Sequence, residues 1–173
     1  VVYSTGTALY AYTVYPQLGT AAGATVLTQL QYRWYQNIDA IQPTTAFAAE
    51  NTAYIGAVRT TAYHLRMNVQ ASGATLAAGT TFKLQFATST GGPWTDVGAI
   101  GSGGAWRGYD NTTPADGNAI SSNLLTGSDV PAKQTYEEAN PSAPTPNSIG
   151  VGKVGEWGWV VQNNAAAGGS TYY

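Results

Sequence analysis

The chain has 173 residues, of which seven are Lys or Arg, nine are Asp or Glu and none is Cys. This length can bury one substantial core, so we expect one domain, with a strand arm and tether over residues 1–24 and a β-sandwich over residues 25–173. A net charge of −2 without a Lys/Arg cluster excludes nucleic acid as a partner. The absence of cysteine excludes disulfides and thiolate metal sites. The sequence contains no apolar run of about 18 residues, the length that would predict membrane insertion.

The first segment, residues 1–15, is rich in Tyr, Thr and Val, which is typical of a strand. In an extended chain its alternating residues face opposite sides. One side carries Tyr10, Tyr12 and Val14, and the other carries Leu9, Ala11 and Thr13. A turn-like stretch at residues 16–19 and a small-residue spacer at residues 20–24 follow. We therefore expect an N-terminal strand on a tether.

Alternation of apolar and polar residues predicts the next strands. They cover residues 30–35, 63–70, 82–86, 94–99, 105–109, 157–162 and 170–173. We expect 63–70 and 82–86 to be antiparallel neighbours, because a Gly-containing connection joins them. In the first of these, Tyr63 and Leu65 belong to an apolar face, whereas His64 and Arg66 belong to a polar face that we expect to be solvated.

Long loops separate these strands, over residues 37–53, 110–130 and 137–148. No stretch of ten residues carries a convincing helical period. The pattern favours an all-β fold, an immunoglobulin-like antiparallel β-sandwich with long loops and an N-terminal strand arm.

The residue types disfavour an enzyme. His64 is the single histidine, and we expect it to be a solvated surface residue rather than a general base. Glu137 and Glu138 are adjacent, but neighbours in an extended chain point to opposite sides and so do not form a hydrolytic pair. Only a buried carboxylate pair in a cleft would restore an enzymatic interpretation.

One loop concentrates oxygen ligands of the kind that calcium binds in extracellular modules. Its candidate ligands are Asp110, Asn111, Asp116 and Asn118, with Asp129 further along. The alternative is that these side chains form Asx turns in a flexible loop. Apart from this calcium hypothesis, we expect no cofactor.

Five Trp and twelve Tyr could provide a surface on which sugars stack. Trp34, Trp157 and Trp159 lie in register with predicted core faces. The rings near turns are the candidate ligand contacts, namely Trp94, Trp106 and Tyr109, alongside Tyr35. The alternative role of these rings is to cap the ends of the sandwich core.

Several motifs resemble a repeat domain of large modular secreted or surface proteins of bacteria, many from uncultivated lineages. They are YRWYQN from Tyr32, PTTAFAAENTA from Pro43, FKLQFATSTGGPWTDVG from Phe82, WRGYDN from Trp106, YEEANPSAPTPNSI from Tyr136 and GEWGWVVQNN from Gly155. Residues 170–173 also resemble the beginning of the penultimate strand of fibronectin type III and related immunoglobulin-like domains. The resemblance implies an extracellular or cell-surface β-sandwich building block without catalytic residues. Domains similar to this one run on past the Tyr172-Tyr173 pair to complete that strand.

Two functions from different classes remain open. The first is a structural subunit of an extracellular bacterial surface filament, which polymerises head to tail with copies of itself by donating residues 9–14 to a neighbour. The second is a carbohydrate-binding or adhesive module of a larger surface protein, which contacts surface glycans through exposed aromatic rings. Residues 1–15 could equally be the first strand of their own sandwich, which would leave no arm to donate.

Overall fold

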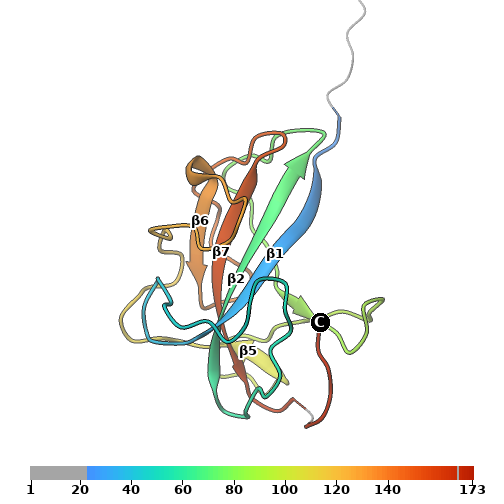
Figure 1. The fold of residues 1–173 in the computed structure, drawn as a ribbon, viewed down its shortest axis with the longest axis vertical. Coiled ribbons are helices and arrows are strands. Elements are labelled where there is room, and N and C mark those ends of the chain that lie inside the picture. Colours follow the sequence, from blue (N-terminus) through green and yellow to red (C-terminus); the bar gives the residue numbers. More distant parts are fainter. Residues whose placement is uncertain (1–22, 167) are drawn as a thin grey trace, which may run out of the picture.

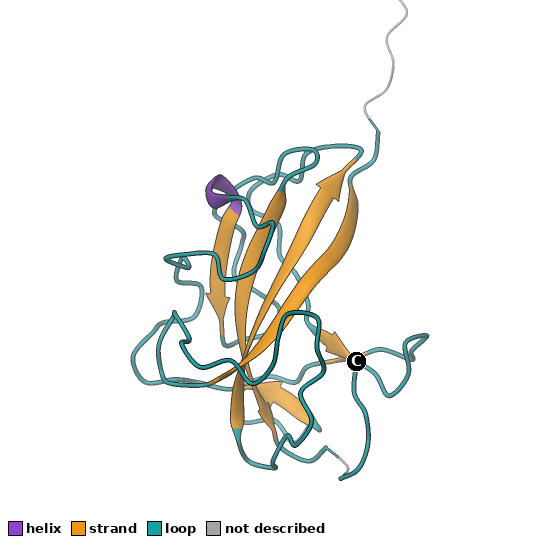
Figure 2. Cartoon of the chain, viewed as in Figure 1, coloured by secondary structure: helices purple, strands orange, loops and turns teal. Residues whose placement is uncertain are grey.

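The computed structural model describes residues 23–166 and 168–173, and it is all-β, as the sequence predicts (Figures 1 and 2). The predicted arm over residues 1–15 lies outside the described residues. The strands are β1 (Val26–Gln36), β2 (Ala62–Ser72), β3 (Gln85–Phe86), β4 (Thr95–Asp96), β5 (Trp106–Gly108), β6 (Lys133–Glu137) and β7 (Val154–Asn163). Among the described residues the single helix is a short 3₁₀ turn, η1 (Val130–Ala132).

The main sheet has the order β1-β2-β7-β5, and β6 also pairs with β7. All of these pairs are antiparallel except β6 with β7, which is parallel. The long strands β1, β2 and β7 run side by side through the body of the domain (Figure 1). They coincide with three of the segments that alternation predicts. The short strand β6 was not predicted, because residues 133–137 lie between two Gly- and Pro-containing loops.

One face of the main sheet carries the apolar core. Leu65 of β2 lies opposite Trp159 of β7, and Met67 lies opposite Trp157. The buried members of this core are Leu65, Ala71, Leu76, Ala132, Ile149, Trp157 and Trp159. The predicted core roles of Trp157 and Trp159 are therefore confirmed, and Trp34 packs against them while remaining half-buried.

The other face of the sheet is polar but fully buried. His64, Arg66 and Asn68 alternate along β2 as predicted, yet each is 0% exposed. The expectation that this face is solvated is wrong, because the loops fold back over it. Residues 41–42 and 120–128 contribute hydrogen bonds and packing there. Loop length, rather than strand pattern, decides the burial of this face.

An ion pair lies at the centre of the polar face. Arg66 Nη1 and Glu156 Oε1 are 3.4 Å apart, and both side chains are fully buried. The remaining donors and acceptors are largely satisfied by the loops. Arg66 donates to the Ile41 carbonyl at 2.9 Å, and the Glu156 carboxylate accepts the N–H groups of Leu124 and Leu125 at 2.9 and 3.1 Å. Such bonding is what makes a buried charge pair tolerable.

His64 is packed rather than hydrogen-bonded. Neither ring nitrogen has a hydrogen-bond partner among the described residues, and the ring meets Tyr136 edge-on at 5.5 Å. Burial, together with the charge of Arg66, lowers the pKa of His64 to about 3, so the imidazole is neutral. Gly158 provides the room, since a Cβ there would lie 2.7 Å from His64 Nε2. His64 is therefore a core residue, contrary to the sequence-based expectation.

A second, two-stranded sheet consists of β3 and β4. The predicted strand over residues 82–86 pairs with β4 instead of lying antiparallel to residues 63–70, so that expectation is wrong. Phe82 and Leu84 nevertheless face the apolar core, and the Phe82 ring meets Trp157 at 4.9 Å. The segment thus packs beneath the main sheet rather than beside β2.

Candidate assembly site

Residues 80–87 form an extended segment whose even-numbered residues are hydrogen-bonded along one edge. The carbonyls of Thr80, Phe82 and Leu84 accept the N–H groups of Thr145, Ser142 and Val97 at 2.9, 2.8 and 3.0 Å. The N–H groups of the same three residues donate to side-chain oxygens of Thr145, Ser142 and Asn140 at 3.1, 2.9 and 3.0 Å. The sequence predicted only irregular structure for the loop over residues 137–148, but this loop pairs with the segment much as a neighbouring strand would.

The odd-numbered edge of the same segment is open. The backbone N–H and C=O groups of Thr81 and Lys83 have no hydrogen bond to any described residue, and both residues are exposed. Only at Ala87 does this edge acquire a partner, because Ala87 and Tyr173 exchange backbone hydrogen bonds at 3.1 and 2.9 Å. We call residues 81–87 the open edge. Unpaired backbone groups in such a row are a template for another strand.

Contacts between aromatic rings fix the position of residues 172–173, next to Ala87. The ring of Tyr172 meets Phe86 at 6.0 Å and Trp106 at 5.9 Å, both edge-on. Trp106 in turn meets Tyr63 of the main sheet at 6.4 Å. The final residues are therefore anchored to the main sheet, although residues 170–173 do not form the predicted strand of their own. This anchoring positions Tyr173 beside Ala87.

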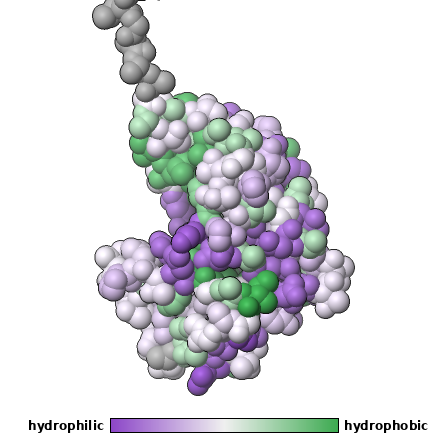
Figure 3. Space-filling model, turned by 180° about the vertical axis from the view of Figure 1, so that it is seen from behind, coloured by the Kyte–Doolittle hydropathy of each residue, from purple (hydrophilic) through white to green (hydrophobic). Residues whose placement is uncertain are grey.

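The open edge borders an apolar surface that the domain covers incompletely. Six hydrophobic side chains pack against the core but remain only partly buried, and we call them the apolar floor: Tyr32, Trp34, Met67, Val69, Phe82 and Leu84. Val26, Leu27 and Leu30 on β1 are 54%, 40% and 37% exposed. Seen from behind, the domain is hollowed on one flank, with apolar surface above the hollow (Figure 3).

β1 is itself an edge strand. Its second half is covered, because the N–H groups of Phe47 and Asn51 donate to the carbonyls of Trp34 and Tyr32 at 3.0 and 2.9 Å. No strand of the described part lies outside its first half, from Val26 to Leu30. The same flank of the molecule therefore offers an uncovered strand edge, an apolar floor and the open edge.

The residues predicted as the assembly strand cannot be placed against this flank. Leu9, Tyr10, Ala11, Tyr12 and Val14 all lie outside the described residues. Their role stays a prediction. The open edge was missed by sequence reasoning, because hydrogen bonding along one edge of a strand leaves no mark on apolar alternation. A row of Asn140, Ser142 and Thr145, spaced to supply side-chain oxygens, was the available signal.

The loop that was predicted to bind calcium forms an open pocket of ≈ 560 Å³, lined by residues 110–116 and Glu138. In the described part of the chain, no group of three or more His, Cys, Asp and Glu side chains is arranged to hold a metal ion. Asp116 Oδ1 already accepts two N–H groups, from Glu138 and Ala139 at 2.6 and 3.0 Å. Calcium binding at this loop stays a prediction.

The other predicted ligands have structural partners as well. The Asn111 side chain is buried and donates to Tyr136 Oη at 2.6 Å. Asn118 pairs with β6 through its backbone, since its carbonyl accepts the Tyr136 N–H at 2.7 Å. Asp129 binds Lys153 Nζ at 3.1 Å and the Val154 N–H at 2.9 Å. In the structure these groups bind neighbouring loops and strands.

Glu137 and Glu138 are both buried, which their position in a predicted loop did not suggest. Glu137 binds the Thr135 hydroxyl and the Ala143 N–H, whereas Glu138 binds the Asn111 N–H and Tyr136 Oη. Burial raises the pKa of Glu137 to about 7 and also raises the pKa of Glu138. Because their partners differ, the two carboxyl groups tie different loops to β6.

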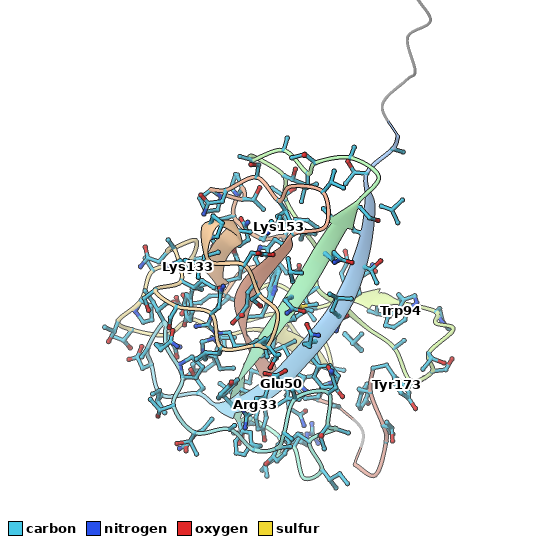
Figure 4. All side chains as sticks on the ribbon, turned by 45° about the horizontal axis from the view of Figure 1, so that its top comes forward. Arg33, Glu50, Trp94, Lys133, Lys153 and Tyr173 are labelled. Atoms are coloured by element: carbon cyan, nitrogen blue, oxygen red, sulfur yellow. The ribbon has the colours of Figure 1, made fainter. Side chains whose placement is uncertain are left out.

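The predicted ligand-contacting rings differ in exposure. Trp94 is 47% exposed and lies on the same flank as Tyr173, well away from Lys133 and Lys153 (Figure 4). Trp106 is half-buried between Tyr63 and Tyr172, and Tyr109 packs against the small core around Tyr136. Tyr35 is buried. Of these rings, Trp94 alone is exposed as expected; the others stabilise the ends of the core.

Comparisons with protein-family models, curated proteins and solved structures found no match to this chain. Within residues 23–166 and 168–173, no helix is both long and apolar enough to span a bilayer.

Proposed function

We propose that this protein is a structural subunit of an extracellular surface filament, built as an immunoglobulin-like sandwich that takes up a strand at the open edge. The observation that carries the proposal is the one-sided bonding of residues 80–87. Every backbone group of Phe82 and Leu84 has a partner, whereas Thr81 and Lys83 have none among the described residues. A strand added at this edge would complete the second sheet.

The added strand also covers apolar surface. Its inward side chains would rest on the apolar floor, where Trp34 and Met67 are only half-buried. Each large side chain that becomes fully buried contributes about 1.5–3 kcal/mol. Backbone pairing and apolar burial then act at one contact, as in other cases of strand addition. Because donor and acceptor lie at different places on one chain, repetition of the contact builds a fibre rather than a closed dimer.

The location rests on the resemblance to repeat domains of bacterial surface proteins. It agrees with a composition in which only 9% of residues are charged, so that Thr, Ser, Asn, Gln and Gly supply the polarity. A surface of this kind relies on backbone pairing and packing rather than on ion pairs between subunits. Binding of surface glycans remains a prediction, and among the predicted ligand-contacting rings only Trp94 is exposed enough to contact one.

The test compares two substitutions at one exposed position of the open edge. Lys83→Pro removes the N–H that an added strand would bind, whereas Lys83→Thr keeps it. Both variants lose the exposed pair between Lys83 and Asp96, so they differ mainly in the edge itself. We expect electron micrographs of the full chain and of Lys83→Thr to show fibres, and those of Lys83→Pro to show single particles.

Thermal unfolding of both variants serves as the control for folding. If Lys83→Pro unfolds as cooperatively as Lys83→Thr and still forms the same fibres, strand addition at this edge is excluded. If the unsubstituted chain remains monodisperse at high concentration, the proposal of a filament subunit fails.

A further inference from the structure

We infer that Trp94 and the polar side chains on its face of the second sheet bind a neutral glycan, through a pyranose ring that lies flat on the indole. The inference goes beyond the proposed filament role and does not depend on it. The sequence marks Trp94 as a candidate ligand contact, and the structure adds the side chains that share its face: Lys83, Gln85 and Asp96.

The Trp94 ring is exposed and held in place at the margin of the molecule (Figure 4). It is 47% exposed, and its indole N–H has no hydrogen bond to a described residue. A Cβ on Gly92 would lie 3.0 Å from Trp94 Cδ1 and 3.3 Å from Nε1, so the ring lies close to this glycine. Ser89 and Gly92 fix the backbone there, since each donates a hydrogen bond to the carbonyl of the other at 3.1 Å. The indole is therefore a fixed apolar plane with a free donor at its rim.

The register of β3 and β4 places polar side chains on the same face as this ring. Gln85 pairs with Asp96, and residues directly opposite in a sheet point to the same side. Alternation adds Lys83, two residues before Gln85, and Trp94, two residues before Asp96, whereas Leu84 faces the core. Two residues along a strand are about 6.5 Å apart. The ring and the polar groups therefore lie side by side, at a spacing that one sugar unit can bridge.

The three polar side chains are joined to one another. Asp96 accepts hydrogen bonds from Lys83 Nζ at 2.6 Å and from Gln85 Nε2 at 2.8 Å. These bonds, that of Lys83 above all, lower the pKa of Asp96, so its carboxylate stays ionised. Two N–H groups of Lys83 and the amide oxygen of Gln85 remain free of described partners. Fixed donors and acceptors in one row suit neighbouring sugar hydroxyl groups, because each hydroxyl both donates and accepts.

Charge and ring chemistry decide the class of ligand. Lys83 and Asp96 neutralise each other, so an anion or a cation would meet one repulsive group for each attractive one. A neutral pyranose with equatorial hydroxyl groups presents its axial C–H bonds to the indole plane and its hydroxyl groups to the rim. Glucose units in β-linkage have this shape on both faces. A β-linked glucan is therefore the ligand class that the site fits.

Strand addition would leave this site open. A strand at the open edge lies in the plane of the sheet, whereas the sugar would lie on the outward face of Gln85 and Asp96. In a fibre every subunit would then present one such site. Repeated weak sites on one polymer bind a long polysaccharide far more tightly than a single site does.

Calorimetric titration of the full chain with cellohexaose tests the inference. We expect binding that Trp94→Ala weakens at least about tenfold, because truncation of a central aromatic contact removes more than about 1.4 kcal/mol. Trp94→Tyr should restore most of the affinity, since it keeps an aromatic plane with a polar rim. Asp96→Asn should weaken binding severalfold. The control is Val151→Ala, which trims an equally exposed apolar side chain close to Lys153, far from Trp94, and should leave the affinity unchanged.

A heparin hexasaccharide serves as the anionic comparison and should bind at least about tenfold more weakly than cellohexaose. Thermal unfolding shows that each variant is folded. An intact chain that does not bind cellohexaose, or a Trp94→Ala variant that binds it as tightly as the intact chain, would overturn the inference.

Electron microscopy of the same variants separates this site from the filament role. Trp94→Ala should form fibres as the intact chain does. If it binds cellohexaose normally but forms no fibres, the ring belongs to a contact between subunits, and the glycan site is wrong. If no protein forms fibres but Trp94 still determines sugar binding, the glycan site stands and the filament role fails.

Discussion

Ala87 and Tyr173 lie side by side and exchange two backbone hydrogen bonds, of 3.1 and 2.9 Å. The pair marks the place where the segment 81–87 gains a backbone partner on its otherwise open edge. Tyr172 is fixed next to it between Phe86 and Trp106. The position of the pair thus depends on packing against the main sheet through Trp106 and Tyr63.

Gly158 should be intolerant of a side chain. A Cβ at this position would lie 2.7 Å from His64 Nε2 and 3.3 Å from Arg66 Nε, so the polar face would have to shift. We expect Gly158→Ala to lower the free energy of unfolding by about 1–3 kcal/mol, the usual cost of overpacking. Gly103→Ala is the control, because a Cβ there meets nothing within 4 Å. Urea unfolding of both variants checks this, and equal stabilities would contradict the packing described.

Glu156→Gln should be among the most destabilising substitutions of a single charge. It leaves the Arg66 guanidinium buried without its counter-ion, and one carboxamide oxygen must replace two carboxylate oxygens that bind Leu124 and Leu125. Breaking a buried pair costs about 3–5 kcal/mol. Asp96→Asn, which removes the exposed pair with Lys83, should change the free energy of unfolding little. If the two variants unfold at the same urea concentration, the buried pair does not stabilise the fold.

His64 should make the protein sensitive to acid. Its pKa is about 3 in the folded chain against an ordinary value of 6.5, so the unfolded chain binds a proton first as the pH falls. Stability is therefore lost between pH 6.5 and 3, at up to about 1.4 kcal/mol per pH unit. His64→Phe should abolish the part of this slope below pH 4.5, where no opposing effect of Glu137 acts, as measured by urea unfolding at a series of pH values. An unchanged slope would mean that other groups cause the loss of stability at acid pH.

Glu137 should act in the opposite direction. Its pKa is raised to about 7 from an ordinary value of 4.5, so the folded chain holds a proton that the unfolded chain releases. Its contribution to stability is present below pH 4.5 and is lost as the pH rises through 7. Between pH 4.5 and 6.5 it offsets His64, and the natural chain should show a shallow dependence. Glu137→Gln should expose the rise with pH that His64 causes; a flat profile in that variant would refute the assignment.

The long strands could be predicted from sequence because apolar alternation is a local signal. Trp157 and Trp159 alternate with Glu156 and Gly158, and the structure places both Trp rings in the core. The prediction failed at His64, where the polar half of the alternation implied solvent. Burial of that face depends on loops distant in sequence, such as residues 120–128, and alternation in one strand carries no information about them.

The open edge could not be predicted from the sequence, because it is defined by which residues do not pair. The alternation of Tyr10, Tyr12 and Val14 is visible in the sequence, but these residues lie outside the described part of the chain and their role as an assembly strand stays a prediction. Lys83 looks like any outward-facing strand residue until the partners of Phe82 and Leu84 are known. The calcium prediction at residues 110–118 stays a prediction, although Asp116 and Asn111 already bind protein groups there.

The most direct test of the central claim is electron microscopy of the full chain beside a variant that lacks residues 1–15, at equal concentrations. The account predicts ordered fibres from the full chain and monodisperse particles from the shortened one, with fibres capped when the shortened chain is added in excess. Fibres formed equally well by the shortened chain, or single particles from both proteins, would contradict it.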